Sequence, residues 1–407
     1  MADVLESTGT VLTDFDPFGM AFRRDPDEFH PKLVAASPGF TTLEGVPSAW
    51  VASYADCTAV LRDFKNWNST KPKNLPGMQR IDFFNGQPVM NYSDPPEHLR
   101  RRKVVQPAFT PKRVERLIAS GDRLVEELLE DLSGRDTFDG VADFGKKFAF
   151  AMMLGELLEL PREDHSIFLN FIATLPSLDA LKPGDPKPAA YLAAWDAGRD
   201  YCRSAIERAR AGSADSVIGL IASSADSGAI SDDEMMAMMV VLMTGGSPTI
   251  SAATAAVLMN MARSPGLAKR LVAEETLAAN VLEESIRLTP PVQLVMRFAG
   301  DDAHLAGRKV DKFTPLYVML SSACHDAAKF PDPFTFNPDR ENAKEHIGFG
   351  FGMHTCIGAP ITRAIVPAML RKVAARLPDL QIADGADIEF ETTPRSRHVS
   401  HLPLRRS

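Results

Sequence analysis

The segment His346–Arg363, HIGFGFGMHTCIGAPITR, has the most distinctive spacing of reactive and small residues in the chain. It places Phe349, Gly352, Cys356 and Gly358 in the pattern F-x-x-G-x-x-x-C-x-G. Closely spaced glycines allow backbone paths that other residues cannot follow, so this stretch can lie flat against a bulky planar partner. Apolar residues at helical spacing follow Cys356, and the N-terminus of a helix favours a thiolate over a thiol.

A lone thiolate suits a metal that takes one protein ligand, and heme iron is such a metal. The spacing leaves two alternatives open, a buried cysteine in a glycine-rich turn and a zinc site. The zinc site would require Cys356, His354, Cys324 and His325 to converge from irregular spacings. We therefore expect Cys356 to bind heme iron.

The whole segment resembles the heme-binding loop of the cytochrome P450 family, the heme-thiolate monooxygenases. The resemblance implies heme b, iron protoporphyrin IX, as the cofactor, with Cys356 as the axial ligand of its iron. It also implies that Phe349, Gly350 and Gly358 lie against the cofactor. One departure is that Cys324 and His325 stand where the family usually has Asn-Arg.

Two further motifs agree with this resemblance. The spacing E-x-x-R from Glu284 to Arg287 puts a carboxylate and a guanidinium on one helix face, and the helix pattern stops at Pro290. An F-x-P-x-R motif ends at Arg340. The resemblance implies that Glu284, Arg287 and Arg340 form a network that locks the core behind the cysteine loop.

The two propionates of a heme require cations or hydrogen-bond donors nearby. His98 and Arg102 stand at i and i+4, on one face of a predicted helix. The resemblance implies that these two residues, with Arg297 and His354, bind the propionates. The remaining basic residues of the run are expected to point away, toward solvent or an acidic electron-transfer partner: Arg100, Arg101 and Lys103.

The stretch from Met235 to Ala262 carries no charged residue. A run of this length could span a bilayer, but its polar centre would need protein partners within the membrane. A long helix buried in a globular core is therefore the favoured interpretation. The stretch resembles the central helix that crosses the distal face of the heme in the family.

The middle of this helix resembles the family's catalytic segment but lacks its acid. Gly245 and Thr249 match the family pattern, whereas Pro248 stands at the position of the acid, and a shift by one residue would put Ser247 there. We expect Pro248 to kink the helix and to free the carbonyl of Thr244 for water. Thr249 would then hydrogen bond to activated dioxygen, and water would replace the acid in proton delivery.

Family positions that line the substrate pocket are mostly apolar here, so a small to medium hydrophobic substrate is expected. Arg395 has three interpretations, a substrate carboxylate partner, a propionate partner and a surface residue. The pocket candidates include the loop around Met78 and Ile81. The other candidates are Phe83, Phe84, Val241, Thr244, Val292, Leu294, Val295 and Arg395.

The composition is that of an ordinary globular enzyme. The 407 residues carry 45 Lys and Arg against 53 Asp and Glu, which argues against a surface that binds nucleic acid over the whole molecule. The spacing of Cys57, Cys202 and Cys324 contains no paired motif, so reduced thiols are expected. Residues 1–20 contain no apolar segment, so we expect no signal peptide or membrane anchor and a cytoplasmic protein. We also expect the protein to be a monomer.

We predict a mainly α fold with a smaller β region, similar to cytochrome P450, with a long central helix over the heme. Residues 1–407 are expected to form a single domain. Its β-rich parts are predicted at 38–55, 290–330 and 378–407, and the remainder is helical. Individual helices are predicted near 54–63 and 357–377.

The resemblance implies a heme-thiolate monooxygenase that inserts one oxygen atom from O2 into a hydrophobic substrate, by hydroxylation or dealkylation. The chain has no flavin or iron–sulfur motif, so electrons would come from a ferredoxin-type protein and its NAD(P)H-dependent reductase. Because Pro248 replaces the acid, a peroxide-driven or a coupling or rearrangement enzyme is the alternative. A heme-based ligand sensor is a remote third interpretation.

Overall fold

The computed structural model describes residues 15–43, 45–70, 72, 84–179, 181, 185–210, 217–226, 230, 232–393 and 395–406. The expectation about the first residues of the chain therefore lies largely outside the described residues. The same holds for the pocket candidates Met78, Ile81 and Phe83.

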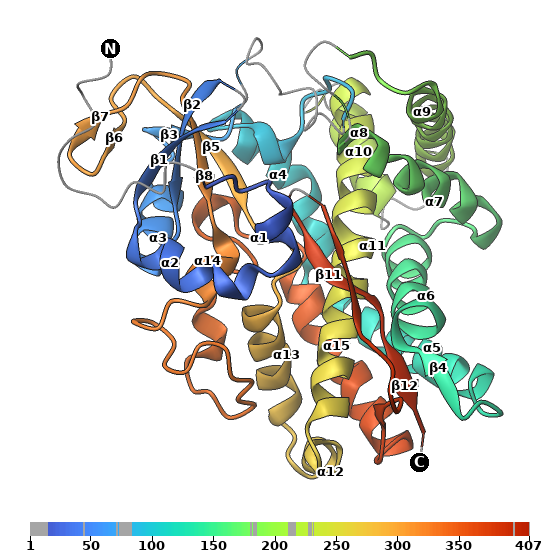
Figure 1. Cartoon of the computed structure of the whole chain (residues 1–407). Coiled ribbons are helices and arrows are strands. Elements are labelled where there is room, and N and C mark those ends of the chain that lie inside the picture. Colours follow the sequence, from blue (N-terminus) through green and yellow to red (C-terminus); the bar gives the residue numbers. More distant parts are fainter. Residues whose placement is uncertain are drawn as a thin grey trace.

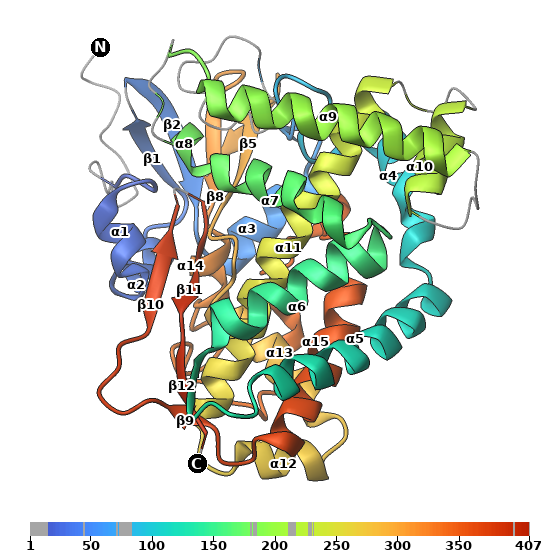
Figure 2. The same cartoon turned by 90° about the vertical axis from the view of Figure 1, so that its right-hand side faces the viewer.

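Helices form most of the molecule (Figure 1), and most strands lie along the side that is on the left in Figure 2. This arrangement confirms the predicted fold class. The helices predicted near 54–63 and 357–377 are α3 and α15. The α-helices are α1 (Met20–Arg24), α2 (His30–Ala35), α3 (Tyr54–Arg62), α4 (Glu97–Val105), α5 (Pro111–Asp131), α6 (Lys146–Phe150), α7 (His165–Thr174), α8 (Pro176–Asp179), α9 (Ala189–Arg210), α10 (Val217–Asp226), α11 (Asp232–Arg263), α12 (Leu267–Ala273), α13 (Leu277–Leu288), α14 (Leu320–Cys324) and α15 (Ala359–Arg376).

The largest sheet joins the early chain to residues near 300, because β2 pairs in parallel with β8. Its strand order is β1 (Gly39–Leu43), β2 (Val46–Val51), β8 (Pro315–Val318), β5 (Val295–Ala299) and β3 (Trp67–Asn68). The remaining sheets are β4 (Thr137–Asp139) with β12 (Pro403–Arg405) and β9 (Gln381–Ile382), β10 (Glu389–Thr392) with β11 (Arg397–His401), and β6 (His304–Leu305) with β7 (Arg308–Lys309). Strands β3 and β4 lie outside the predicted β-rich parts. The single-domain organisation stays a prediction.

Helix α11 runs through the middle of the helical part and packs against α6, α13 and α15 (Figures 1 and 2). Its segment Ala237–Arg263 is apolar and long enough to cross a membrane, but 72% of its most apolar window is buried inside the protein. A buried core helix meets the same criteria of length and composition as a membrane span. Its burial supports the interpretation as a core helix, and the apolar side chains make it the centre of the largest hydrophobic cluster.

The first hairpin depends on a glycine that lies against a buried tryptophan. Gly39 is paired with Trp50 across β1 and β2, and Trp50 is completely buried. A Cβ atom at Gly39 would lie 2.1 Å from Cζ2 of the indole ring. Any side chain at position 39 must therefore displace Trp50 from its packed position.

We predict that Gly39→Ala lowers the free energy of unfolding by roughly 1 to 3 kcal/mol, the usual cost of overpacking a core. Gly134→Ala is the matched control, because a Cβ there meets nothing within 4 Å. Thermal and denaturant unfolding of both variants would test this. Equal stability of the two variants would contradict the packing argument.

Candidate cofactor site

The loop before α15 has a backbone shape that only its glycines permit. Gly350 and Gly352 have positive φ angles, of 74° and 70°. A Cβ on Gly352 would lie 2.8 Å from the carbonyl oxygen of Leu61. The amide of Cys356 donates a hydrogen bond of 2.8 Å to the carbonyl of Phe349, which closes the loop on itself. This geometry holds Cys356 three residues before the start of α15 at Ala359.

Cys356 is exposed, whereas Cys57, Cys202 and Cys324 are buried. Enough protein nevertheless surrounds the thiol that burial, the largest influence, raises its pKa above the ordinary value. Hydrogen bonds from the amides of Gly358 and Ala359 act in the opposite direction. The amides at the helix N-terminus therefore favour the thiolate as expected, but desolvation of the thiol outweighs their effect. A positive ion bound to the sulfur would reverse that balance.

Four residues that the resemblance assigned to the propionates lie together beside this loop. The rings of His98 and His354 have centroids 4.2 Å apart, and Nε2 of His354 lies 2.9 Å from Oγ of Ser69. Arg102 donates a 2.9 Å hydrogen bond to the carbonyl of Thr355, next to the cysteine. Burial, followed by the charge of Arg297, lowers the pKa of His354 to about 3. This histidine is therefore neutral at physiological pH.

Two of these residues lack the partners that buried polar groups normally have. Nδ1 of His98 is buried without a hydrogen-bond partner among the described residues. Arg297 is 6% exposed, and the one hydrogen bond given for its guanidinium in the described part of the chain goes to the carbonyl of Met296, at 2.8 Å. Burial lowers the pKa of Arg297 to about 10. A ligand with carboxylates would satisfy both groups, so these residues fit the propionates of a heme.

Asp94 and Ser69 belong to this site and were not predicted from the sequence. The carboxylate of Asp94 accepts hydrogen bonds of 2.9 Å from the amides of Ser69 and Thr70. Ser69 in turn contacts His354. Asp94 lies just before the helix of His98 and Arg102, and this position is the sequence signal that could have indicated it. Its partners Ser69 and Thr70 lie 25 and 24 residues earlier in the chain, so spacing alone does not predict the contact.

The structure brings Glu284, Arg287 and Arg340 together in the core. Arg287 donates to both carboxylate oxygens of Glu284, at 2.7 and 2.8 Å, and Arg340 donates from Nε at 3.0 Å. Glu284 and Arg287 are completely buried, and Arg340 is 7% exposed. The two arginines also bind backbone carbonyls from Cys324 to Thr335. Buried charges require such complete pairing.

The adjacent Glu283 forms a second network, which sequence analysis missed. Arg363 donates to both of its carboxylate oxygens, at 2.7 and 3.0 Å, and Nε2 of His346 lies 3.0 Å from Oε2. Although burial alone would raise its pKa, hydrogen bonds from His346 and Arg363 lower the pKa of Glu283 to about 2. Glutamates are common on helices, and no spacing rule links Glu283 to an arginine 80 residues away.

The central turn of α11 has an open side where the catalytic segment was predicted. Gly245 is exposed, and Pro248 and Thr249 are half-buried, in a helix that is otherwise mostly buried. Oγ1 of Thr249 donates a hydrogen bond of 2.7 Å to the carbonyl of Gly245. The helix continues through Pro248, and the kink expected there stays a prediction.

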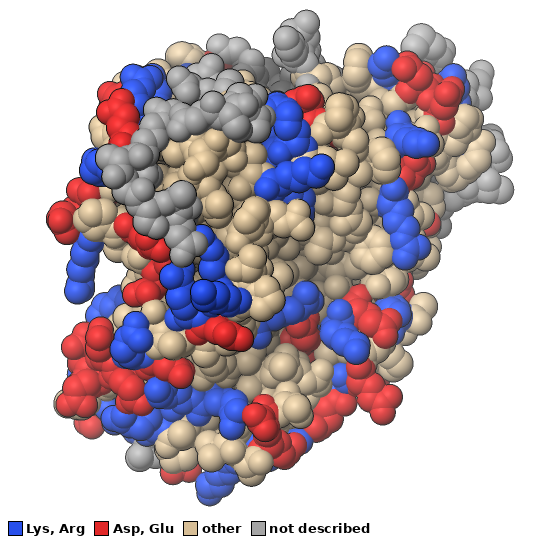
Figure 3. Space-filling model, turned by 180° about the vertical axis from the view of Figure 1, so that it is seen from behind, with Lys and Arg blue, Asp and Glu red and all other residues tan. Residues whose placement is uncertain are grey.

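The interpretation of Arg101 as a residue that faces solvent or a partner is wrong, and Arg100 is only partly exposed. Arg101 is 8% exposed, and its Nε donates a 2.7 Å hydrogen bond to Glu234, near the start of α11. Arg100 also pairs with Glu234 and with Glu97. Both arginines therefore hold α4 against α11, while Lys103 is exposed as expected. On the face in Figure 3, basic and acidic side chains are interspersed in small groups.

The structure gives the pocket candidates different surroundings. Arg395 lies 3.1 Å from the hydroxyl of Tyr92, whose ring contacts Phe84. Ser396, next to Arg395, forms a β-bridge with Val292. By contrast, Leu294 lies in a buried cluster with Trp50 and offers almost no surface to a ligand. Val241 is also buried, whereas Thr244 and Val295 are half-buried.

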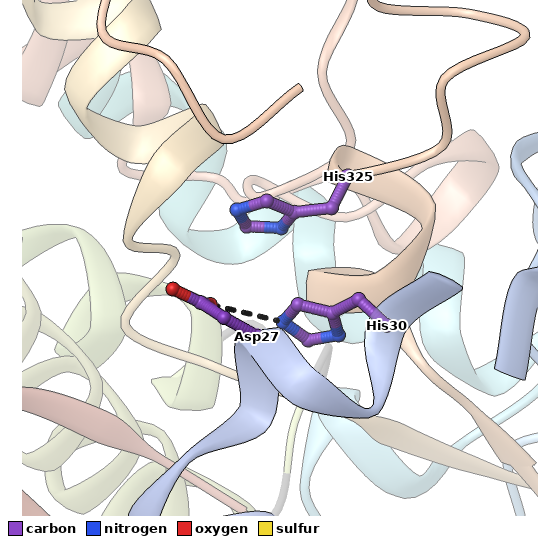
Figure 4. Close-up of side chains that lie close together, drawn as sticks. All are labelled: Asp27, His30 and His325. Atoms are coloured by element: carbon purple, nitrogen blue, oxygen red, sulfur yellow. Dashed lines mark ion pairs between the residues drawn. The ribbon is translucent and has the colours of Figure 1, made fainter. Parts of the chain in front are cut away.

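The zinc alternative is not supported, because its four residues lie in different surroundings. His354 lies beside His98, whereas His325 is stacked on His30, with ring centroids 4.6 Å apart and an interplanar angle of 13° (Figure 4). Asp27 lies 3.8 Å from Nε2 of His30. An imidazole nitrogen binds a metal ion through a lone pair that lies in the plane of the ring. Because the rings of His30 and His325 are stacked, these planes are separate, and one ion cannot lie in both. We interpret the pair as a packing contact between α2 and α14.

Comparison with known proteins identifies the family. Residues 41–376 match the family model "Cytochrome P450". The chain therefore belongs to the cytochrome P450 family, and it is an oxidoreductase of the monooxygenase class. Heme is the cofactor of this family.

Three relatives illustrate the similarity. The polyketide biosynthesis cytochrome P450 PksS of Bacillus subtilis is 28% identical over 371 residues, which cover 88% of each chain. The cytochrome P450 monooxygenase PikC of Streptomyces venezuelae is 28% identical over 97% of this chain and 94% of its own. The crystal structure of the myxobacterial cytochrome P450 CYP267B1 in complex with myristic acid has a TM-score of 0.84 and 25% identity, over 96% of this chain and 98% of its own.

We predict that Arg297→Met has opposite effects on the apoprotein and on heme binding. The substitution removes a buried, poorly paired charge, so the apoprotein should gain roughly 1 to 3 kcal/mol of stability. Heme binding should weaken, because a propionate loses its cation. Unfolding of the apoprotein and the rate of heme transfer to a scavenger protein would be measured. Arg371→Met on α15 is the control, and loss of stability in the Arg297→Met apoprotein would contradict this prediction.

We predict that Glu283 contributes to acid sensitivity within a defined window. Its folded pKa of about 2 lies below the ordinary 4.5, so its stabilising effect is complete above pH 4.5 and is lost as the pH falls toward 2. The full effect is of order 3 kcal/mol. Glu283→Gln should be less stable than wild type above this window, and the difference should shrink as the pH falls. A difference that does not change with pH, in urea unfolding, would contradict the prediction.

Proposed function

We propose that this protein is a monooxygenase with heme b as its cofactor, which inserts one oxygen atom from O2 into a small to medium hydrophobic substrate. The observation that carries the proposal is the combination of an exposed Cys356 with two buried, poorly satisfied groups, Nδ1 of His98 and the guanidinium of Arg297. A thiolate ligand and partners for two carboxylates are the requirements of a heme-thiolate site.

In this proposal each residue of the chain has a distinct task. Cys356 supplies the sulfur ligand, and the amides of Gly358 and Ala359 stabilise its negative charge. His98, Arg102, Arg297 and His354 bind the propionates and orient the cofactor. The bound heme supplies the activation of dioxygen and the transfer of oxygen.

Thr249 is proposed to act on the distal side as a hydrogen-bonding group. Its hydroxyl proton is engaged by the carbonyl of Gly245, so in this rotamer the oxygen offers acceptor lone pairs to the open side. Pro248 has no backbone N–H group and no acidic side chain that could deliver a proton. We therefore propose that a water molecule near the free carbonyl of Thr244 delivers protons. The hydroxyl oxygen of Thr249 would accept a hydrogen bond from this water and position it.

The substrate is proposed to be a hydrophobic natural product or fatty acid. The names of PksS and of the complex of CYP267B1 with myristic acid support these two classes. The half-buried residues Val292, Val295 and Thr244 are the proposed substrate contacts, together with Arg395. A carboxylate on the substrate would suit Arg395, which lies beside Tyr92 at the turn after β10.

The proposed electron donor is a ferredoxin-type protein with an NAD(P)H-dependent reductase, acting on a monomeric cytoplasmic enzyme. Hydroxylation or dealkylation is the proposed outcome. The alternative is a peroxide-driven or coupling reaction on the same heme. The specific observation that favours the alternative is Pro248, which removes the side chain that would deliver protons in the reductive route.

A comparison of two oxidant systems tests these functions. A panel of macrolactones and fatty acids is first screened for compounds that shift the heme from low to high spin. Product yield is then measured with NADH, redox proteins and O2, and separately with hydrogen peroxide alone. We predict that the reductive system gives the higher yield, and that Thr249→Ala releases more peroxide per NADH. A higher yield with peroxide alone would favour the alternative.

A further inference from the structure

The neighbouring residues Glu283 and Glu284 on α13 belong to two different ion-pair networks. Glu284 is completely buried between Arg287 and Arg340, far from solvent. Glu283 instead faces the cysteine loop, where it binds Arg363 of α15 in a two-pronged ion pair and also contacts His346. The two charges of this second network therefore lie on the side of the helix that faces the proposed iron ligand.

The hydrogen bonds around His346 define its protonation. The amide of Gly348 donates a 2.9 Å hydrogen bond to Nδ1, so Nδ1 is the acceptor nitrogen of the ring. Nε2 must then carry the proton that is donated to Glu283, at 3.0 Å. His346 is neutral in this arrangement. The charged members of the network are Glu283 and Arg363.

Phe349 connects this network to the cysteine. The guanidinium carbon of Arg363 lies 4.7 Å from the centre of the phenyl ring, and the ring of His346 lies 5.5 Å from it on a tilted approach. The carbonyl of Phe349 accepts the amide hydrogen of Cys356 at 2.8 Å. The positive charge of Arg363 also acts on the thiol itself and favours its ionised form.

We propose that Glu283 and Arg363 set the reduction potential of the heme iron bound to Cys356, as positioning residues that act through charge and through the Phe349 ring. This inference rests on the proposed heme-thiolate site. Reduction of ferric to ferrous iron adds one electron, which a nearby positive charge favours and a nearby negative charge opposes. Glu283 limits the effect of Arg363 by compensating its charge.

The charge mechanism predicts opposite shifts from the two halves of one ion pair. Glu283→Gln leaves Arg363 uncompensated, so the potential should become more positive than in wild type. Arg363→Gln leaves Glu283 uncompensated, so the potential should become more negative. A purely structural role predicts otherwise, since both substitutions break the same ion pair and would loosen the loop in the same way.

The experiment is a spectroelectrochemical titration of each holoprotein with dithionite and redox mediators. Arg363→Lys keeps the positive charge and should return the potential most of the way toward wild type. Arg376→Gln is the matched control, because Arg376 forms an ion pair with Glu126 at the far end of the same helix and should not change the potential. If Glu283→Gln fails to fold, the pair Arg363→Gln and Arg363→Lys still tests the sign of the effect.

Shifts of the same sign, or no shift, in Glu283→Gln and Arg363→Gln would overturn the inference. A shift in Arg363→Lys as large as in Arg363→Gln would also overturn it. The carbon monoxide spectrum of the reduced wild-type protein separates this failure from failure of the proposed function. A thiolate-type spectrum with the wrong shifts rejects only the role of Glu283 and Arg363, whereas absence of that spectrum rejects both.

Discussion

A carboxylate buried between two arginines determines the arrangement of the side of the molecule that carries Cys356. Glu284 is completely buried, so its charge is stable only because Arg287 and Arg340 both donate to it. The same arginines bind the carbonyls of Cys324, at the end of α14, and of Pro331, in the irregular chain that follows it. Loss of one member would leave an unpaired charge in the core. This network therefore fixes α13, and α13 in turn presents Glu283 to the cysteine loop.

The opposite situation holds where the cofactor is proposed to bind. There the described part of the protein buries His98 and Arg297 without giving them full partners, which costs stability in the absence of a ligand. Burial likewise disfavours the ionised form of the Cys356 thiol, because it raises the pKa. An iron porphyrin would relieve all three conditions, since its propionates would pair with the first two groups and its iron would bind the sulfur. The residues of this site therefore fit an anionic ligand that contains a metal ion.

Much of this could be predicted from the sequence, because the signals were local. The glycines around Cys356 predicted a special backbone path, and positive φ angles occur at Gly350 and Gly352. The apolar run predicted the buried helix α11. The pairing of Arg101 with Glu234, and of Arg363 with Glu283, could not be predicted, because each joins helices that are distant in the sequence. The net direction of the pKa shift of Cys356 could not be predicted either, since it depends on how much protein surrounds the thiol.

The central claim is that Cys356 binds heme iron as a thiolate. It is tested most directly by the carbon monoxide difference spectrum of the reduced holoprotein, in wild type and in Cys356→Ser. The account predicts the strongly red-shifted Soret band of a thiolate-ligated heme in wild type and its loss in the variant, even when the variant retains heme. A wild-type band at the position of a nitrogen-ligated heme, or an unchanged band in Cys356→Ser, would contradict it.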